Sequence, residues 1–179
     1  MRVISGTQRG RKINIPKSLK IRPTTDMSKE SLMNILNSKY DFYSIKALDL
    51  FSGSGSLSYE FCSRGCKEVS AVEKNRKCWE FIKKKSTELD FGIKVHKQDV
   101  FYYLNKTSSK FDIIFADPPY SFKIYQYEDL ISLIFEKKII NDTGCLIIEH
   151  SNKISLKDQK NYFENRKYGG CTLSFFYSQ

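Results

Sequence analysis

The stretch Asp117-Pro118-Pro119-Tyr120 carries residue types suited to chemistry on a flat ring that bears an amine. Two consecutive prolines stiffen the backbone and remove two amide donors. The segment therefore presents acceptors, namely carbonyl oxygens and the aspartate carboxylate, and the aromatic ring that follows offers a stacking surface. This combination suits a planar base with an NH2 group, and a chance proline turn explains it poorly.

A second stretch, residues 49–55, reads Asp-Leu-Phe-Ser-Gly-Ser-Gly. Gly53 and Gly55 permit a tight turn and let a ligand lie against bare backbone, next to the amides that begin the following helix. Ser58 stands where a dinucleotide-binding fingerprint has its third glycine. By itself the motif is equally consistent with a ligand loop and with a plain glycine-rich turn between strand and helix.

Acidic residues follow the next two predicted strands. Glu73 lies 18 residues after Gly55, a spacing at which a carboxylate accepts hydrogen bonds from ribose hydroxyls. A surface glutamate is the less favoured alternative. Asp99 either accepts a hydrogen bond from an adenine amino group, with Val100 packed on the ring, or caps a helix. The sequence leaves these two roles for Asp99 open.

Hydrophobic patterns place these motifs at strand ends. Predicted strands span residues 46–51, 68–72, 93–96, 111–116 and 145–149. Predicted helices span residues 57–66, 74–89, 100–105 and 125–138, after an earlier one capped by Thr24 or Thr25. This alternation indicates a parallel sheet with helices on both faces, which binds ligands at the carboxyl ends of its strands. Residues 162–168 and 171–177 predict an antiparallel hairpin around Gly169-Gly170, and residues 2–6 and 11–15 predict another.

Composition narrows the class of protein. A chain of 179 residues with 40% hydrophobic and 14% aromatic residues fits one folded domain with at most a short appendage. It contains no long apolar window and no apolar stretch at its start, so we expect neither a membrane span nor a secretory signal. Five cysteines without a CxxC pair argue against a disulfide framework or a zinc ribbon and favour the cytoplasm.

The net charge of +10 suggests a polyanionic partner, although lysine-rich composition from an AT-rich genome would also produce it. The distribution of charge favours the partner. The first 22 residues contain no acid, and their basic residues are Arg2, Arg9, Arg11, Lys12, Lys17, Lys20 and Arg22. We therefore predict a basic β-hairpin arm over residues 1–22, which holds RNA, beside a domain over residues 23–179. The alternative is that this segment only covers part of the domain.

Asp117–Tyr120 looks like the (Asp/Asn/Ser)-Pro-Pro-(Tyr/Phe/Trp) motif of S-adenosylmethionine-dependent amino methyltransferases, and residues 49–55 resemble their cofactor loop. More closely, and nearly end to end, the chain resembles the RsmD family, bacterial 16S rRNA guanine-N2 methyltransferases. The further matching segments are Arg2-Val3-Ile4-Ser5-Gly6, Arg9-Gly10-Arg11, Arg22-Pro23-Thr24-Thr25-Asp26, Ser63-Arg64-Gly65 and Val72-Glu73.

The resemblance implies an α/β fold, the Rossmann-like class I methyltransferase fold. Its mostly parallel seven-stranded sheet has helices on both faces, a C-terminal antiparallel hairpin and an N-terminal β-hairpin extension. It also implies methylation of a guanine N2 amine in 16S rRNA, free or in an assembled small-subunit particle, by a cytoplasmic enzyme expected to be a monomer. S-adenosylmethionine is the implied cofactor, S-adenosylhomocysteine its product, and no metal is expected.

The resemblance also assigns roles to residues. The residues expected to act on the base are Asp117, Pro118 and Tyr120. The residues expected at the cofactor are Asp49, Phe51, Ser52, Gly53, Ser54, Gly55, Glu73, Asp99 and Val100. The residues expected to contact RNA are Arg2, Arg9, Arg11, Lys12, Arg22 and Tyr120.

Two departures from the family pattern and several rival functions accompany this interpretation. Met27 and Lys29 replace the usual arginines, and lysine lacks the planar fork of arginine. Ser58 replaces the usual glycine of the cofactor helix. The rivals are a DNA adenine-N6 or cytosine-N4 methyltransferase, a protein glutamine methyltransferase, and a non-catalytic RNA-binding assembly factor. The chain length disfavours the first, Asp117 the second, and the intact motifs the third.

Overall fold

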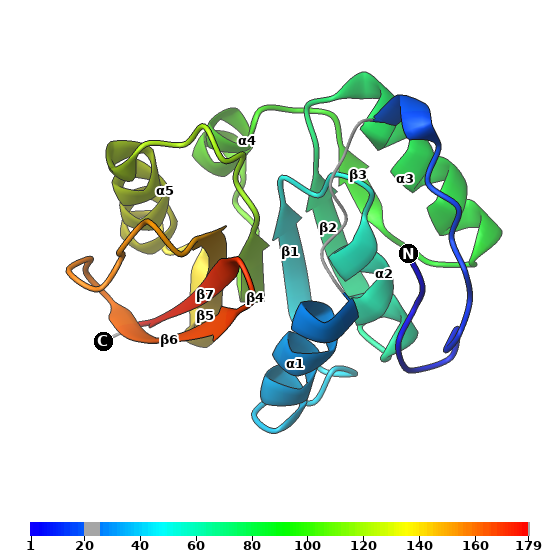
Figure 1. Ribbon diagram of the computed structural model, residues 1–179, viewed down its shortest axis with the longest axis horizontal. Helices are drawn as coiled ribbons and strands as arrows, with labels where there is room; N and C mark the ends of the chain where they lie inside the picture. Colours follow the sequence, from blue (N-terminus) through cyan, green and yellow to red (C-terminus); the bar gives the residue numbers. More distant parts are fainter. Residues whose placement is uncertain (20–25, 179) are drawn as a thin grey trace.

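The computed structural model describes residues 1–19 and 26–178, and this part of the chain forms a seven-stranded sheet with the order β3-β2-β1-β4-β5-β7-β6 (Figure 1). Neighbouring strands from β3 to β5 run parallel, and β7 runs antiparallel to both β5 and β6. The strands are β1 (Lys46–Leu50), β2 (Glu68–Val72), β3 (Lys94–His96), β4 (Phe111–Ala116), β5 (Ile140–Ser151), β6 (Tyr162–Tyr168) and β7 (Cys171–Tyr177). The expected Rossmann-like sheet with a C-terminal antiparallel hairpin is confirmed.

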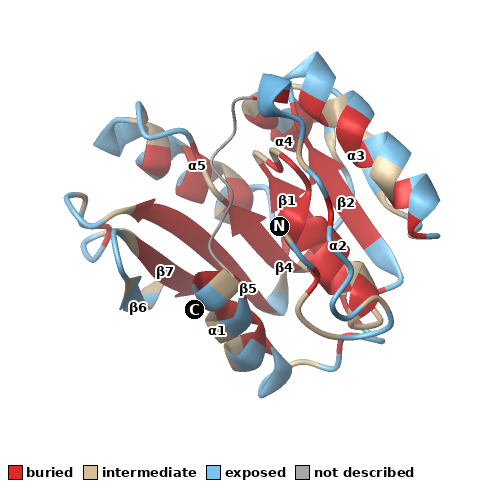
Figure 2. Cartoon of the chain, turned by 45° about the vertical axis from the view of Figure 1, so that its right-hand side comes forward, coloured by how far each residue is buried: buried red, intermediate tan, exposed pale blue. Residues whose placement is uncertain are grey.

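Helices cover both faces of this sheet. They are α1 (Asp26–Asn37), α2 (Ser56–Ser63), α3 (Arg76–Glu88), α4 (Val100–Lys106) and α5 (Ile124–Glu136), after a short 3-10 helix, η1 (Lys17–Leu19). Apolar side chains of α1, α2 and α3 pack on one face, and those of α4 and α5 pack on the other. Figure 2 shows the central strands and α2 buried, whereas α3 and α5 are exposed on their outer sides. Successive residues of β4 alternate between the two cores, so both faces of this strand are apolar.

Several element boundaries differ from the sequence prediction by one to five residues. α3 begins at Arg76 instead of residue 74, because the Asn75 side chain caps it and accepts hydrogen bonds from the amides of Lys77 and Cys78. α2 ends at Ser63, three residues early. β5 begins at Ile140 instead of residue 145, because Ile140 pairs with Phe111 ahead of a register shift. Its polar residues 141–143 conceal this start in the sequence.

The N-terminal segment folds back on itself, with one antiparallel bridge between Arg2 and Lys12, and the amides of Val3 and Ile13 donate hydrogen bonds to the carbonyls of Arg11 and Met1. Its backbone also bonds to α2. The Glu60 carboxylate accepts hydrogen bonds from the amides of Ile4 and Ser5 at 2.9 and 3.1 Å. Apolar side chains of the segment, Val3 and Ile13 among them, pack in one cluster with residues of α3. The segment is therefore fastened to the face formed by α2 and α3.

The strand order reverses direction between β1 and β4. From β1 the chain proceeds outward to β2 and β3, and it then crosses to β4 on the other side of β1. Ligands of open α/β sheets bind outside the carboxyl ends of strands at such a switch point. Leu50 pairs with Ala116 in the sheet, so the residues that follow these two strands emerge next to each other.

Candidate active site

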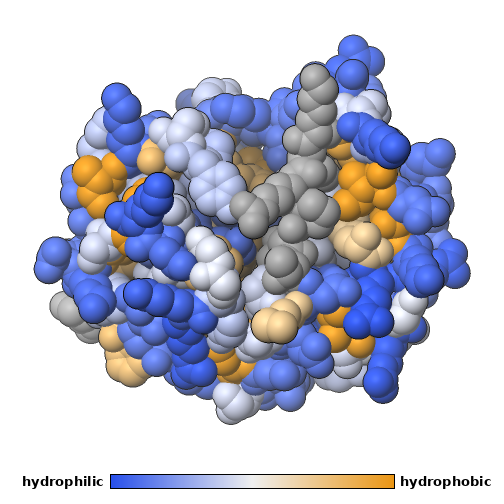
Figure 3. Space-filling model, viewed as in Figure 1, coloured by the Kyte–Doolittle hydropathy of each residue, from blue (hydrophilic) through white to orange (hydrophobic). Residues whose placement is uncertain are grey.

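A cavity of about 420 Å³ lies at the switch point, between the segment after β1 and the segment after β4. Asp49, Ser52, Gly53 and Ser54 line one side, and residues 117–120 line the other. Figure 3 shows the surface hollowed above these strand ends, with apolar atoms deep in the hollow and hydrophilic groups around it. The two motifs that the sequence singled out, which begin 68 residues apart, thus share one cavity of a size typical for small-molecule sites.

The loop after β1 depends on glycine at two positions. Gly53 has φ 54° and Gly55 has φ 79°, in the left-handed region that favours glycine. A Cβ atom on Gly55 would lie 2.9 Å from the ring of Tyr59, so this turn packs directly on α2. Gly53 lines the cavity, whereas Gly55 is not among its lining residues. The structural role of Gly55 is therefore to shape the loop.

Asp49 is buried beneath this loop and lines the cavity. Its Oδ2 accepts hydrogen bonds from the amide and the hydroxyl of Ser58, at 3.1 and 2.5 Å. Burial raises the pKa of Asp49 to about 7, and the two hydrogen bonds from Ser58 oppose this rise. Ser58, which stands in place of the expected glycine, therefore fixes the carboxylate of Asp49 near the end of β1.

Glu73 follows β2, lines the cavity and has both carboxylate oxygens engaged. Oε2 accepts a hydrogen bond from the amide of Gly53 at 2.8 Å, and Oε1 accepts one from the amide of Asn75 at 2.7 Å. Each carboxylate oxygen can accept a second hydrogen bond. Glu73 thus ties the glycine loop to the start of α3 while it lines the cavity, and its contact with a ribose hydroxyl stays a prediction.

Asp99 has the capping role that the sequence left open. Its Oδ1 accepts hydrogen bonds from the amides of Phe101 and Tyr102, and Asp99 caps α4. The neighbouring residues Gln98 and Val100 line the cavity, whereas Asp99 does not. A contact from Asp99 to an adenine amino group stays a prediction. Val100, which is buried, has the position expected for packing on a ring.

The segment after β4 forms the opposite wall. The amide of Asp117 donates a hydrogen bond to the carbonyl of Leu50 at 3.4 Å, which joins this segment to the end of β1. Pro118 is buried, whereas Tyr120 is 61% exposed, so its ring stands at the mouth of the cavity. Burial, and then the negative charge of Asp117, raise the pKa of the Tyr127 hydroxyl behind this wall to about 12.

Of the described residues expected to contact RNA, Tyr120 lines the cavity, and Arg2, Arg9, Arg11 and Lys12 are not among its lining residues. Arg9, Arg11 and Lys12 are exposed, and the Arg2 guanidinium pairs with Asp26 at 2.9 Å. Arg22 lies outside the described residues, as do the predicted caps Thr24 and Thr25. Met1 connects the arm to the site, because its sulfur lies 3.5 Å from the hydroxyl of Ser54.

Sequence reasoning overlooked several lining residues. Lys74, assigned to a solvated helix, precedes α3 and lines the cavity. The lining also includes Ser56, Leu57, Val72 and Phe115, which the sequence offered only as ordinary helix and strand residues. Tyr127 belongs to the apolar face of α5, and only its proximity to Asp117 in the fold reveals it.

Comparison with known proteins agrees with this geometry. The model of the family described as Conserved hypothetical protein 95 matches residues 1–177. The chain belongs to this family. One relative of this chain is the protein named Ribosomal RNA small subunit methyltransferase D from Buchnera aphidicola subsp. Acyrthosiphon pisum (strain APS). It is 35% identical over 162 residues, which cover 89% of this chain and 83% of the relative.

Solved structures share the fold of this family member. The protein yhhF from Escherichia coli superposes with a TM-score of 0.86 at 25% identity, over 100% of this chain and 99% of that one. The protein SMU.776, complexed with SAH, superposes with a TM-score of 0.67 at 15% identity, over 84% of this chain and 49% of that one. The second likeness shows the fold alone.

Proposed function

We propose that this protein transfers a methyl group from S-adenosylmethionine to the exocyclic N2 amine of a guanine in 16S rRNA. The observation that carries the proposal is the shared cavity: a glycine loop with Glu73 on one side, and an acceptor wall with an exposed aromatic ring on the other. Membership in the family and a relative named as a ribosomal RNA methyltransferase support RNA as the substrate.

The donor set fits S-adenosylmethionine. Backbone at Gly53 lets a ligand approach closely, and a Cβ atom placed there would meet nothing nearer than 3.9 Å. Glu73 can accept hydrogen bonds from ribose hydroxyls, and Val100 offers an apolar surface for adenine. When bound, S-adenosylmethionine supplies a methyl group already activated by its sulfonium. The SAH held by SMU.776, a protein of the same fold, agrees with this choice.

The opposite wall acts on the base. The lone pair of a guanine N2 amine is delocalised into the ring, so this nitrogen is a poor nucleophile. Hydrogen bonds from the amine to the Asp117 carboxylate and the Pro118 carbonyl favour a pyramidal nitrogen with a localised lone pair. Tyr120 at the mouth stacks on a base taken out of its helix or loop. The negative charge of Asp117 also stabilises positive charge that develops on the nitrogen.

Radiolabelled methyl transfer to rRNA, followed by nucleoside mass spectrometry, tests the proposal. The wild-type protein should produce N2-methylguanine. Asp117→Ala should lower the rate by at least about a hundredfold, as expected when a preorganised electrostatic partner is lost. Asp142→Ala is the matched control, because Asp142 is exposed near the start of β5, at the opposite end of the sheet, and should leave the rate unchanged. Methylated adenine or cytosine, or a methylated protein, would instead identify one of the rival activities.

A further inference from the structure

Exposed aromatic rings gather on the elements that border the cavity mouth. Tyr102 on α4 is 57% exposed and Tyr125 on α5 is 54% exposed, beyond the 61% exposed Tyr120 of the site itself. Large apolar rings are costly to leave in water, and a group of them on one surface marks an interaction site. None of the roles proposed above uses Tyr102 or Tyr125.

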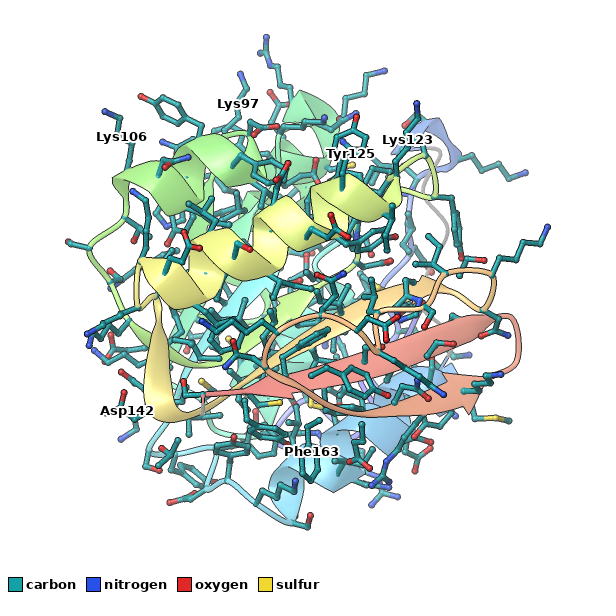
Figure 4. All side chains as sticks on the ribbon, turned by 90° about the vertical axis from the view of Figure 1, so that its left-hand side faces the viewer. Lys97, Lys106, Lys123, Tyr125, Asp142 and Phe163 are labelled. Carbon is teal, nitrogen blue, oxygen red and sulfur yellow. The ribbon has the colours of Figure 1, made fainter. Side chains whose placement is uncertain are left out.

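Lysines stand between these rings. Lys97 precedes α4, Lys106 lies in its last turn, and Lys123 caps α5. In Figure 4 the three lysines and Tyr125 lie along one edge of the molecule, with α4 and α5 beneath them. We name the set Lys97, Tyr102, Lys106, Lys123 and Tyr125 the α4–α5 rim.

The lysines of the rim have fewer ion-pair partners than the basic residues of α3. On α3, Arg76 pairs with Glu80, and both Lys84 and Lys85 pair with Glu88. Among the described residues, the recorded ion pairs include none for the three rim lysines.

Two of the acids on these elements already serve the fold. Asp99 caps α4, and Glu128 accepts a hydrogen bond from Gln159. Asp129, in the second turn of α5, is an exposed acid. Glu128 and Asp129 remain exposed one turn after Tyr125, so an anion on the rim would bind at its lysines, of which Lys106 lies at the far end of α4, beside Lys110.

The rim rests on a rigid base. The ring of Phe122, between Tyr120 and Lys123, lies 5.4 Å from that of Phe51 and 5.5 Å from that of Tyr127. It also stacks on Phe101 of α4, with centroids 6.4 Å apart. This cluster joins the loop after β1, α4 and α5, so the backbone that carries the exposed rings is held in place before any partner binds. A preorganised backbone loses little freedom on binding.

From this arrangement we infer that the α4–α5 rim is a second RNA-binding surface, which holds the single-stranded nucleotides that flank the target base. The inference rests on the proposed function. Tyrosine rings stack on bases of any sequence, and interleaved lysines contact the phosphates between them. The N-terminal arm lies on the face formed by α2 and α3, whereas the rim belongs to α4 and α5, so RNA that contacts both crosses the cavity mouth.

Charge-neutralised variants test the rim. In Lys97→Gln/Lys106→Gln/Lys123→Gln, affinity for a short fluorescein-labelled single-stranded RNA of mixed sequence should fall, and the slope of log affinity against log salt should shrink by up to about two units. The matched control is Lys67→Gln/Lys157→Gln/Lys167→Gln. These exposed lysines precede β2, precede β6 and belong to β6, outside α4 and α5, and their removal should change the slope by less than half as much.

The rings are tested separately. Tyr125→Ala and Tyr102→Ala should each weaken RNA binding about tenfold, as expected for one lost stacking contact, and the Phe variants should bind normally. Affinity for S-adenosylmethionine should be unchanged in all of them.

Two results overturn the inference. If the rim triple variant keeps the wild-type salt slope while the wild type still methylates rRNA, the rim is not an RNA surface and the proposed function stands. If the rim variants bind RNA normally but fail only on particles that contain ribosomal proteins, the surface binds protein. Failure of the wild type to methylate any RNA refutes the proposed function instead.

Discussion

At the scale of single residues, the site contains carboxylates with three different tasks. Asp49 is buried and holds Ser58, Glu73 ties two backbone segments together, and Asp117 stands on the opposite wall. The sequence could predict their convergence, because each ends a parallel strand. It could not show that Asp99 points its Oδ1 at the amides of α4, since an aspartate at that position suits both a cap and a ligand.

Glu73→Ala should weaken S-adenosylmethionine binding by about 1–3 kcal/mol, as for a lost hydrogen bond to a charged group. It should also lower the melting temperature, because the amides of Gly53 and Asn75 lose their acceptor. Calorimetry and thermal unfolding measure the two effects. Glu80→Ala, on the exposed side of α3, is the control and should change neither. A lower melting temperature with unchanged affinity would leave Glu73 a purely structural role.

Asp49 should make stability depend on pH. Its pKa is about 7 in the folded protein and near 3.8 unfolded, so between these values the folded state binds more protons. The contribution of Asp49 to the free energy of unfolding is therefore greatest below about pH 4. This contribution is lost as pH rises through 7, and the loss is about 4 kcal/mol at most. Asp49→Asn should remove this loss, so its stability relative to wild type rises between pH 4 and 8. Parallel urea-unfolding profiles for the two proteins would contradict the assignment.

At the scale of elements, periodicity and turn residues predicted most strands and helices to within a few residues. The errors have local causes. The start of β5 is polar, and Ile140 joins the sheet only through its pairing with Phe111. The N-terminal hairpin keeps backbone hydrogen bonds between its two arms, but the amides of Ile4 and Ser5 bond to the Glu60 side chain of α2. Such long-range hydrogen bonds leave no periodic signal in the sequence.

A buried ion cluster fastens the N-terminal segment to α2. Glu60 is fully buried, contacts Arg64 Nε at 3.0 Å and lies 3.6 Å from Lys29 Nζ. Burial lowers the pKa of Lys29, and the charge of Glu60 opposes this. Lys29 also donates a hydrogen bond to the Arg2 carbonyl at 2.6 Å. A single point charge satisfies these contacts, which explains how lysine functions where the family usually has arginine.

Glu60→Gln should therefore destabilise the protein by about 3–5 kcal/mol, because two buried cations lose their anion and the new amide faces backbone donors. Urea unfolding measures this change. Glu88→Gln, which removes an exposed partner of Lys84 and Lys85, is the control and should cost less than about 1 kcal/mol. Equal stability of Glu60→Gln and wild type would show that the cluster does not fasten the segment.

At the scale of the whole molecule, the cavity lies between two basic surfaces of different construction. On one side the arm packs through Val3, Ile13 and Leu19 while Arg9, Arg11 and Lys12 stay exposed. On the other side lies the α4–α5 rim. The described residues include no helix long and apolar enough to cross a membrane. The packing of the arm shows that covering α3 and holding RNA are compatible tasks, since apolar and basic side chains of the same segment can perform them separately.

The arm should bind RNA through charge alone. Arg9→Gln/Arg11→Gln/Lys12→Gln removes exposed charges and leaves the apolar contacts and the Glu60 hydrogen bonds in place, so the fold should persist. Phosphate contacts carry no sequence information, so affinity should fall for every RNA tested. The salt slope should shrink by up to about two to three units, somewhat less than one per lost contact. Arg2 is spared because its guanidinium already pairs with Asp26.

A variant that combines the arm and the rim substitutions tests whether the two surfaces contribute independently to RNA binding. The described parts of the two surfaces pack on opposite faces of the sheet, so their effects on the free energy of binding should add within about 0.5 kcal/mol. A fluorescence titration across a salt series measures all four proteins of this cycle with the same RNA, and calorimetry should show unchanged affinity for S-adenosylmethionine in each. An arm variant with the wild-type salt slope would restrict residues 1–22 to a covering role and leave the rim as the RNA-binding side of the cavity.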